Sequence, residues 1–149
     1  MPSIKKILCA VDLSEHSKMV AEYAITLAKA FDAEITVLYT APSLSQYVGF
    51  HVPPSSIENF VGEIVTGAEQ SMDEFIAEAF TDSSVKANGV ILSGYAAQEI
   101  IGYANKNEMD VIVMGTHGRT GIDRILFGSV AEKVVKTATM PVMTVRPKV

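Results

Sequence analysis

Short apolar runs alternate along the chain with longer segments in which apolar residues recur every three or four positions. The runs at residues 4–11 and 111–114 are too short for helices and too uniformly apolar for half-exposed strands, so they predict buried parallel strands. Three further strands are expected at residues 34–41, around 85–93 and near 141–146.

Helical spacing of apolar residues predicts a helix over residues 15–32, with Ser14 as its N-cap. A second apolar stripe over residues 57–79 predicts one long helix, although Gly62 and Gly67 each weaken it by up to ~1 kcal/mol relative to Ala. A loop over 42–56 joins this helix to the second strand; it is long enough to act as a lid or to be a tolerated insertion.

Two more helices are expected, one carrying the apolar positions of 97–104 and one after residue 128. Strands that alternate with helices predict right-handed crossovers and a mostly parallel sheet covered on both faces, a doubly wound α/β fold of order 3-2-1-4-5. Ligands bind such sheets at the topological switch point, here between strands 1 and 4. Asp12 and Gly115 end those two strands, so both are expected at one crevice.

A glycine-rich segment, GTHGRTGIDRILFGS, follows the fourth strand with Gly115, Gly118, Gly128 and Ser129 at its ends. We expect Gly115 and Gly118 to adopt positive φ and curl the backbone N–H groups into a nest, and Gly128 and Ser129 to open the next helix. The predicted ligand is a phosphate chain. The alternative is that the glycines serve only turn geometry and Ser129 is only an N-cap.

Known phosphate motifs and composition narrow the classes of function. The segment lacks GxxxxGK[ST], and the first strand-helix turn lacks GxGxxG, which argues against P-loop NTPases and dinucleotide-binding domains. A net charge of -5 and a pI near 5.1 disfavour nucleic-acid binding. No apolar stretch reaches the ~18 residues of a membrane helix. The single cysteine, Cys9, excludes an internal disulfide and is expected to pack as a small hydrophobe. Its being alone is typical of a cytoplasmic protein. We expect one domain over residues 1–149.

The pattern Gly115-x2-Gly118-x9-Gly128-Ser129 resembles the ATP-binding signature of the universal stress protein family. The N-terminal IKKILCAVDLSEHS and the C-terminal AEKVVKTATMPVMTVRP extend the resemblance over the whole chain. It implies a Rossmann-like fold of the adenine nucleotide alpha hydrolase type, ATP with Mg²⁺ bridging its phosphates, and a homodimer through the C-terminal edge strand. Asp123 departs from the family pattern, because it places a negative charge inside the phosphate loop.

The resemblance also implies which residues contact the nucleotide. Asp12 matches a position that contacts the nucleoside, although an Asp at a strand-helix turn often only caps the helix. Thr40 matches a position whose backbone reaches the adenine. The expected contacts are Asp12, Thr40, Met114, Gly115, Gly118, Arg119, Gly128, Ser129 and Val130.

No catalytic constellation is evident. His117 has no paired nucleophile or orienting carboxylate, so we expect an exposed loop histidine or an incidental phosphate contact. His16 and His51 fit no metal-ligand spacing. The preferred function is therefore an ATP-binding regulatory protein that acts on an unidentified protein partner through nucleotide-dependent conformation. The alternatives are a slow ATPase or phosphotransferase using His117, Arg119 and Arg124, and a nucleotide-free interaction protein.

Overall fold

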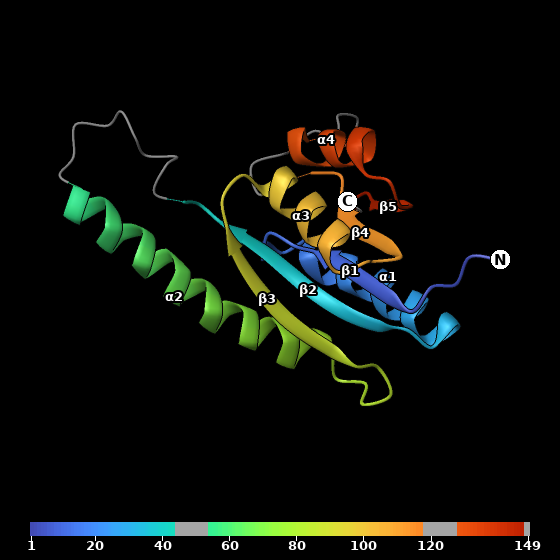
Figure 1. Ribbon diagram of the computed structural model, residues 1–149. Helices are drawn as coiled ribbons and strands as arrows, with labels where there is room; N and C mark the ends of the chain where they lie inside the picture. The colour runs from blue at the N-terminus through green and yellow to red at the C-terminus, as the bar shows by residue number, and fades with distance from the viewer. Residues whose placement is uncertain (44–53, 118–127, 148–149) are drawn as a thin grey trace.

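The computed structural model describes residues 1–43, 54–117 and 128–147. Five strands form one parallel sheet of order β3-β2-β1-β4-β5, as predicted (Figure 1). The elements in chain order are β1 (Lys6–Ala10), α1 (Ser17–Phe31), β2 (Glu34–Ala41), α2 (Pro54–Ala79), β3 (Ala87–Ser93), α3 (Ala96–Lys106), β4 (Val111–Gly115), α4 (Ser129–Thr137) and β5 (Val142–Val145).

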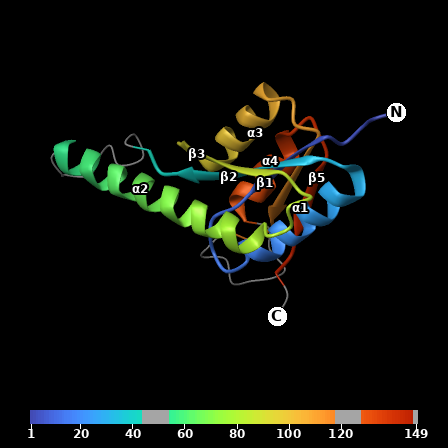
Figure 2. The same cartoon turned by 90° about the horizontal axis from the view of Figure 1, so that it is seen from below.

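Helices cover both faces of the sheet. In Figure 2, α1 and α2 lie on one side of the strands and α3 on the other. Alternate residues of β1 face the two layers: Ile7 and Cys9 belong to the cluster under α1 and α2, and Leu8 to the cluster under α3 and α4. Burial on both faces explains why these strands are uniformly apolar.

Cys9 has no exposed surface, and burial raises its pKa to about 12, as for a thiol packed as a hydrophobe.

The prediction that Ser14 caps the first helix is wrong. The helix begins at Ser17, and His16 occupies the N-cap position without a side-chain cap. The cause is Asp12, whose Oδ1 accepts hydrogen bonds from the Ser14 N–H at 2.9 Å and from the Ser17 hydroxyl at 3.0 Å. These bonds fold residues 12–16 into a separate turn before the helix starts.

Helix α2 is a single helix, as predicted, and it begins at Pro54, three residues earlier than expected. The loop after β2 is therefore shorter than 42–56, and the stretch 44–53 assigned to a lid lies outside the described residues. At Gly62 and Gly67 an added Cβ would meet nothing within 4 Å. Both glycines therefore weaken the helix without allowing any close contact in return.

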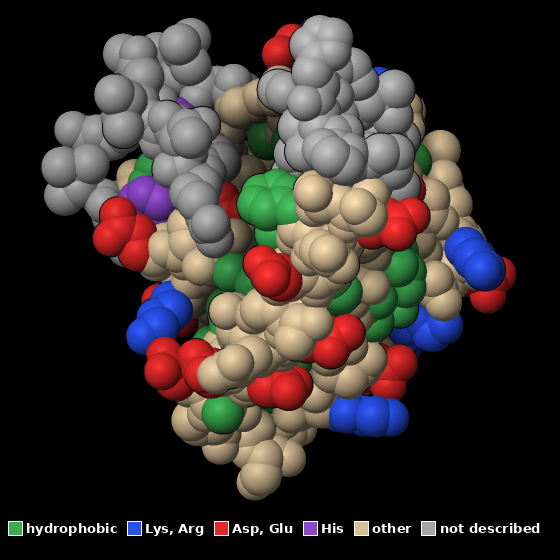
Figure 3. Space-filling view, turned by 90° about the vertical axis from the view of Figure 1, so that its left-hand side faces the viewer, with side chains coloured by type: hydrophobic (Ala, Val, Ile, Leu, Met, Phe, Trp, Pro, Cys, Tyr) green, Lys and Arg blue, Asp and Glu red, His purple; other side chains and the backbone are tan. Residues whose placement is uncertain are grey.

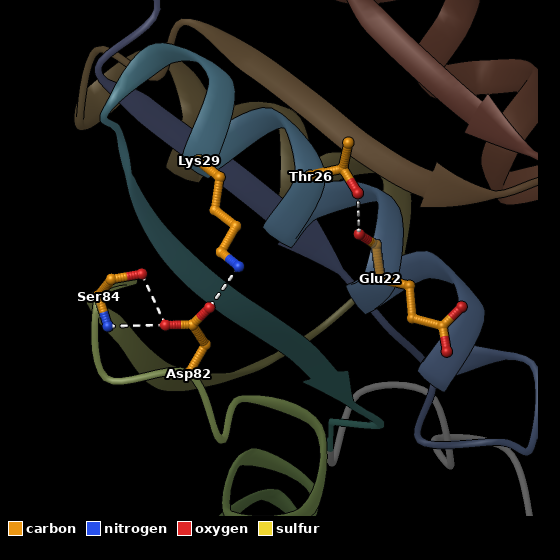
Figure 4. Close-up of polar contacts among 5 residues, drawn as sticks. All are labelled: Glu22, Thr26, Lys29, Asp82 and Ser84. Carbon is orange, nitrogen blue, oxygen red and sulfur yellow. Dashed lines mark hydrogen bonds and ion pairs between the residues drawn. The ribbon is translucent and has the colours of Figure 1, made fainter.

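A polar cluster ties the end of α1 to the segment between α2 and β3 (Figure 4). The Lys29 ammonium forms an ion pair with the Asp82 carboxylate. The other oxygen of Asp82 accepts hydrogen bonds from the Ser84 N–H at 2.9 Å and the Ser84 hydroxyl at 2.6 Å. Lys29, followed by the Ser84 donors, holds the pKa of Asp82 well below its usual range.

Within the described residues, no helix combines the length and apolarity needed to cross a membrane.

Candidate functional site

A cleft of about 350 Å³ opens at the carboxyl ends of β1 and β4, the switch point of the strand order. Its volume is in the range typical of small-molecule sites. Its lining comes from α1, β2, α3 and the first turn of α4, together with the ends of β1 and β4. Seven of the nine residues predicted to contact a nucleotide line this cleft: Asp12, Thr40, Met114, Gly115, Gly128, Ser129 and Val130. The other two, Gly118 and Arg119, lie outside the described residues.

The turn after β1 places Asp12 at the cleft. Leu13 follows with φ of 61°, a left-handed conformation that a leucine adopts only when its surroundings hold it. The bonds from Asp12 Oδ1 to Ser14 and Ser17 supply that hold. Both interpretations of Asp12 thus keep a physical basis: its carboxylate organises the turn, and the residue also lines the cleft.

The two ends of the glycine-rich segment meet at the edge of the cleft. The Gly128 N–H donates to the Thr116 carbonyl at 2.6 Å, and the Thr116 N–H donates to the Val145 carbonyl in β5 at 3.0 Å. The start of α4 is therefore fixed to the ends of β4 and β5. Residues 118–127, including Arg124 and Asp123, lie outside the described residues.

Helix α4 begins at the cleft, and no side chain of the described residues caps its first turn. Its N-cap is Gly128, in an extended conformation and without a side-chain hydrogen bond. Glu132 makes the first bond back to the Gly128 carbonyl, so the three N–H groups before it have no acceptor within the helix. Those groups belong to Ser129, Val130 and Ala131, which all line the cleft. Ser129 is the first helical residue, so the interpretation that it is only an N-cap is wrong.

The expected positive φ at Gly115 is also wrong. Gly115 is the last residue of β4 and pairs with Val145 of β5, which keeps its backbone extended. Gly94 is the glycine with positive φ among the described residues. A Cβ on Gly115 would lie 3.6 Å from the His117 carbonyl and from Val20 Cγ2, which is ordinary contact. The N–H donors at this site are therefore offered by α4 rather than by a left-handed turn at Gly115.

Two residues at the cleft carry buried polar atoms without partners. Thr40 Oγ1 and His117 Nε2 have almost no exposed surface and no hydrogen bond within the described part of the chain. His117 is half-buried, with Nδ1 2.8 Å from Thr116 Oγ1, so the expectation of an exposed loop histidine is wrong. Because buried polar atoms are normally paired, these two mark a region suited to a polar ligand.

The cleft also contains residues that the sequence did not single out. Val20 of α1 and Ile100 of α3 contribute apolar side chains to its lining. Their spacing on the helices indicated burial, but helical periodicity does not separate a residue that covers the sheet from one that lines a cleft. In the residues that the structure describes, no group of three or more His, Cys, Asp or Glu side chains could hold a metal ion.

Comparison with known proteins identifies the family. The sequence model of the universal stress protein family matches residues 3–146. The chain belongs to this family. The universal stress protein MJ0531 of Methanocaldococcus jannaschii is 38% identical over 142 residues, covering 95% of this chain and 82% of that protein. MJ0577 of the same organism is 31% identical, covering 97% and 96%.

Solved structures of universal stress proteins share the fold. The structure of MJ0577 superimposes with a TM-score of 0.80 at 28% identity, covering 97% of this chain and 96% of that one. UspA from Lactobacillus plantarum gives a TM-score of 0.84 at 24% identity, covering 98% and 100%. More distant members have been solved with nucleotides. The one from Archaeoglobus fulgidus holds dAMP and gives a TM-score of 0.68 at 19% identity, covering 97% of this chain and 98% of that one. The one from Arabidopsis thaliana holds AMP and gives a TM-score of 0.65 at 19% identity, covering 95% and 90%.

Proposed function

We propose that this universal stress protein binds an adenine nucleotide, ATP with Mg²⁺, in the cleft between β1 and β4. The observation that carries the proposal is the first turn of α4, which no described side chain caps and whose residues Ser129, Val130 and Ala131 line that cleft. Unpaired N–H groups and the positive end of the helix dipole attract phosphate oxygens. The nucleotides bound by more distant family members support the choice of adenine.

The cleft matches the parts of a nucleotide in order. Leu38 and Ile100 provide an apolar wall for the base, and Thr40 a buried hydroxyl that has no hydrogen-bond partner among the described residues. Asp12 can accept hydrogen bonds from ribose hydroxyls. The phosphates then extend toward Gly128 and Ser129, where glycine leaves room for close approach. When bound, Mg²⁺ would neutralise charge on the phosphates.

We further propose that the protein acts through its nucleotide-bound conformation on a protein partner, in the cytoplasm, rather than by turnover. The titratable side chains among the described residues that line the cleft are those of Asp12, His16, Tyr39 and His117. Asp12 Oδ1 is engaged in the turn, and His117 Nδ1 faces Thr116. Rapid phosphoryl transfer needs a positioned base and several cations at the transferring phosphate, and this set supports neither.

The proposed assembly is a homodimer through β5. In the sheet of the described residues β5 lies at an edge, paired on one side with β4, and Met143 is 36% exposed. An apolar edge strand invites pairing with a second copy.

Calorimetric titration tests the proposal. We expect saturable heat with ATP and Mg²⁺, and weaker binding of adenosine. Ser129→Ala removes one hydroxyl donor to a phosphate, so ATP affinity should fall about 5- to 10-fold, equivalent to about 1–1.4 kcal/mol, while adenosine affinity stays the same. Thr137→Ala, at the exposed far end of the same helix, is the matched control.

Two results would contradict the proposed function. No saturable heat and no thermal shift at millimolar ATP would leave a nucleotide-free interaction protein. Phosphate release faster than a few turnovers per hour that His117→Ala abolishes would show an enzyme instead.

A further inference from the structure

Strand β3 forms one edge of the sheet, and among the described residues its only strand partner is β2. The Ile35 N–H donates to the Lys86 carbonyl at 2.8 Å, and the Gly94 N–H donates to the Ala41 carbonyl at 2.9 Å, so the even-numbered residues on either side of β3 face β2. In a parallel strand the backbone groups of successive residues point to alternate sides. The N–H and C=O groups that point away from the sheet therefore belong to Ala87, Gly89, Ile91 and Ser93.

The outer side of β3 lacks the features that commonly protect an edge strand. Protected edges are short or carry Lys or Pro. Strand β3 has seven residues, spans about 23 Å, and contains neither a charged residue nor a proline. Gly89 and Ser93 are exposed, and because Gly89 has no side chain its exposed surface is backbone. The proposed homodimer uses β5, at the opposite edge, and leaves β3 free.

Helix α2 packs over this strand and brings negative charge to it. At Gly89 an added Cβ would lie 2.7 Å from Met72 Cγ and 2.9 Å from Ile76 Cδ1, so the helix and the strand are in close contact. Helix α2 contains six acidic residues and no Lys or Arg. Figure 3 looks from the side on which α2 lies in Figure 1: Asp and Glu side chains are spread over this face, and Lys and Arg lie at its margins.

Two of these carboxylates lie on the flank of α2 beside the free edge. Glu78 pairs with Lys18 and so marks the flank toward α1, which packs over β1 and β4. Glu69 lies about 180° round the helix from Glu78, and Asp73 about 140°. Both are exposed, and neither forms an ion pair within the described residues. Glu69 and Asp73 therefore border β3 on the side away from the rest of the sheet.

The opposite face of β3 is apolar. Val90 and Leu92 pack against the cluster under α3 and α4, where both are only partly buried. Figure 2 views the molecule from the side of β3, with α2 on one side of the strand and α3 on the other. A strand added at this edge would thus meet carboxylates along one face and apolar side chains along the other.

We propose that β3 binds an extended segment of another protein as an additional strand of the sheet, a segment that alternates Lys or Arg with apolar residues. Its backbone would pair with the outward N–H and C=O groups of β3. Its basic side chains would face Glu69 and Asp73, and its apolar side chains would cover Val90 and Leu92.

A second copy of this chain is a poorer occupant. Strand β3 has no basic residue of its own, and pairing of two β3 edges would set the acidic flanks of two α2 helices side by side. The inference rests on the proposed function only in giving its protein partner a surface. Its test contains no nucleotide, so its failure is distinguishable from a failure of ATP binding.

The experiment measures fluorescence anisotropy of a labelled peptide that alternates Lys with Val and matches β3 in length, titrated with the full chain. One matched probe is N-methylated at every backbone amide, so it keeps its charges and cannot donate backbone hydrogen bonds. A second replaces every Lys with Glu. We expect saturable binding of the unmodified basic peptide and binding at least about 10-fold weaker for both matched probes.

Substitutions at the edge separate backbone pairing from charge. Ser93→Pro removes an outward N–H that has no partner in the sheet, and should weaken binding about 10-fold, whereas Ser93→Ala keeps this donor and should change it less than about 2-fold. Glu69→Lys should weaken binding about 5- to 10-fold. Glu74→Lys, the same charge change at an exposed position on another flank of α2, is its matched control and should have an effect of less than about 2-fold.

Amide exchange tests the same edge without any substitution. The Val90 and Leu92 N–H groups face β2 and should exchange slowly with or without peptide. The Gly89 and Ile91 N–H groups face outward, so they should exchange quickly in the free protein and at least about 10-fold more slowly with saturating peptide.

Three results would overturn the proposal. Equal binding of the N-methylated peptide, or equal affinity of all four variants, would mean that no strand is added at β3. A larger species in sedimentation that Ser93→Pro dissociates would show a second copy as occupant. Slow exchange of the Gly89 amide without peptide would show that this chain already covers the edge. Should Ser93→Pro fail to fold, Glu69→Lys and the exchange at Gly89 carry the test.

Discussion

Substitution of Asp12 separates its two roles, in the turn after β1 and at the nucleotide. Its Oδ1 accepts two hydrogen bonds, from the Ser14 N–H at 2.9 Å and the Ser17 hydroxyl at 3.0 Å. Asp12→Ala removes both and leaves the donors in a partly buried turn. Asp12→Asn keeps an oxygen at the same place but removes the negative charge.

The two variants should differ in stability. Hydrogen bonds to a charged group contribute about 1.5–3 kcal/mol each, and the lower end applies to a partly buried turn, so Asp12→Ala should cost about 3 kcal/mol. For a chain of this length that corresponds to a melting temperature lower by about 6–12 °C. Asp12→Asn retains two neutral hydrogen bonds and should lose about 1 kcal/mol, or about 2–4 °C.

The same variants should not differ in nucleotide binding. The amide of Asp12→Asn replaces a carboxylate oxygen with a donor that cannot accept from a ribose hydroxyl, so both variants should bind ATP about 10-fold more weakly, a loss of about 1.4 kcal/mol. Thermal melts and calorimetric titration measure the two effects. Wild-type affinity in Asp12→Asn would refute the ribose contact. A melting temperature of Asp12→Ala within 1 °C of wild type would refute the account of the turn.

Three further predictions concern the fold. Gly94→Ala should lower the free energy of unfolding by about 1–3 kcal/mol, because Gly94 has φ of 143° and a Cβ would lie 2.7 Å from a glutamate oxygen. Gly62→Ala should instead raise the free energy of unfolding by about 0.5–1 kcal/mol. Urea unfolding that gave the opposite order of stability would contradict these roles of the two glycines. Cys9, with its pKa raised to about 12, should not react with Ellman's reagent at pH 8 until the protein unfolds, and rapid labelling of the native protein would show that it is not buried. The lowered pKa of Asp82 means that its ion pair with Lys29 stabilises the fold above about pH 3.9, the value of an unfolded Asp, and is lost as the pH falls below it. Between pH 5 and pH 2, Lys29→Met should therefore lose less stability than wild type, and equal losses in acid melts would exclude this role.

The strand order could be predicted because parallel strands buried on both faces are uniformly apolar. Residues 111–114 form such a run, and all four are buried in the structure. Alternation of strands and helices then predicted a doubly wound parallel sheet, and the expected order 3-2-1-4-5 is confirmed, with Asp12 and Gly115 at one cleft. These features follow from local pattern and chain connectivity.

Other features depend on which of several possible partners a residue contacts in the folded protein, and the sequence alone does not show which partner is chosen. Ser14 is a good N-cap by type, but the Asp12 carboxylate two residues earlier is the stronger acceptor and takes the Ser14 N–H for its own turn. Gly115 is able to adopt positive φ, yet pairing with Val145 keeps it in the strand. His117 follows a strand end, where exposure is the usual outcome, but contact with Thr116 draws its ring inward.

The central claim is that the cleft between β1 and β4 holds an adenine nucleotide with its phosphates at the start of α4. A crystal structure of the protein soaked with ATP and Mg²⁺ tests it most directly. The account predicts phosphate density within hydrogen-bond distance of the Ser129 and Val130 N–H groups and the base beside Leu38. Density elsewhere on the molecule, or a cleft filled by the protein's own side chains at saturating ATP, would contradict it.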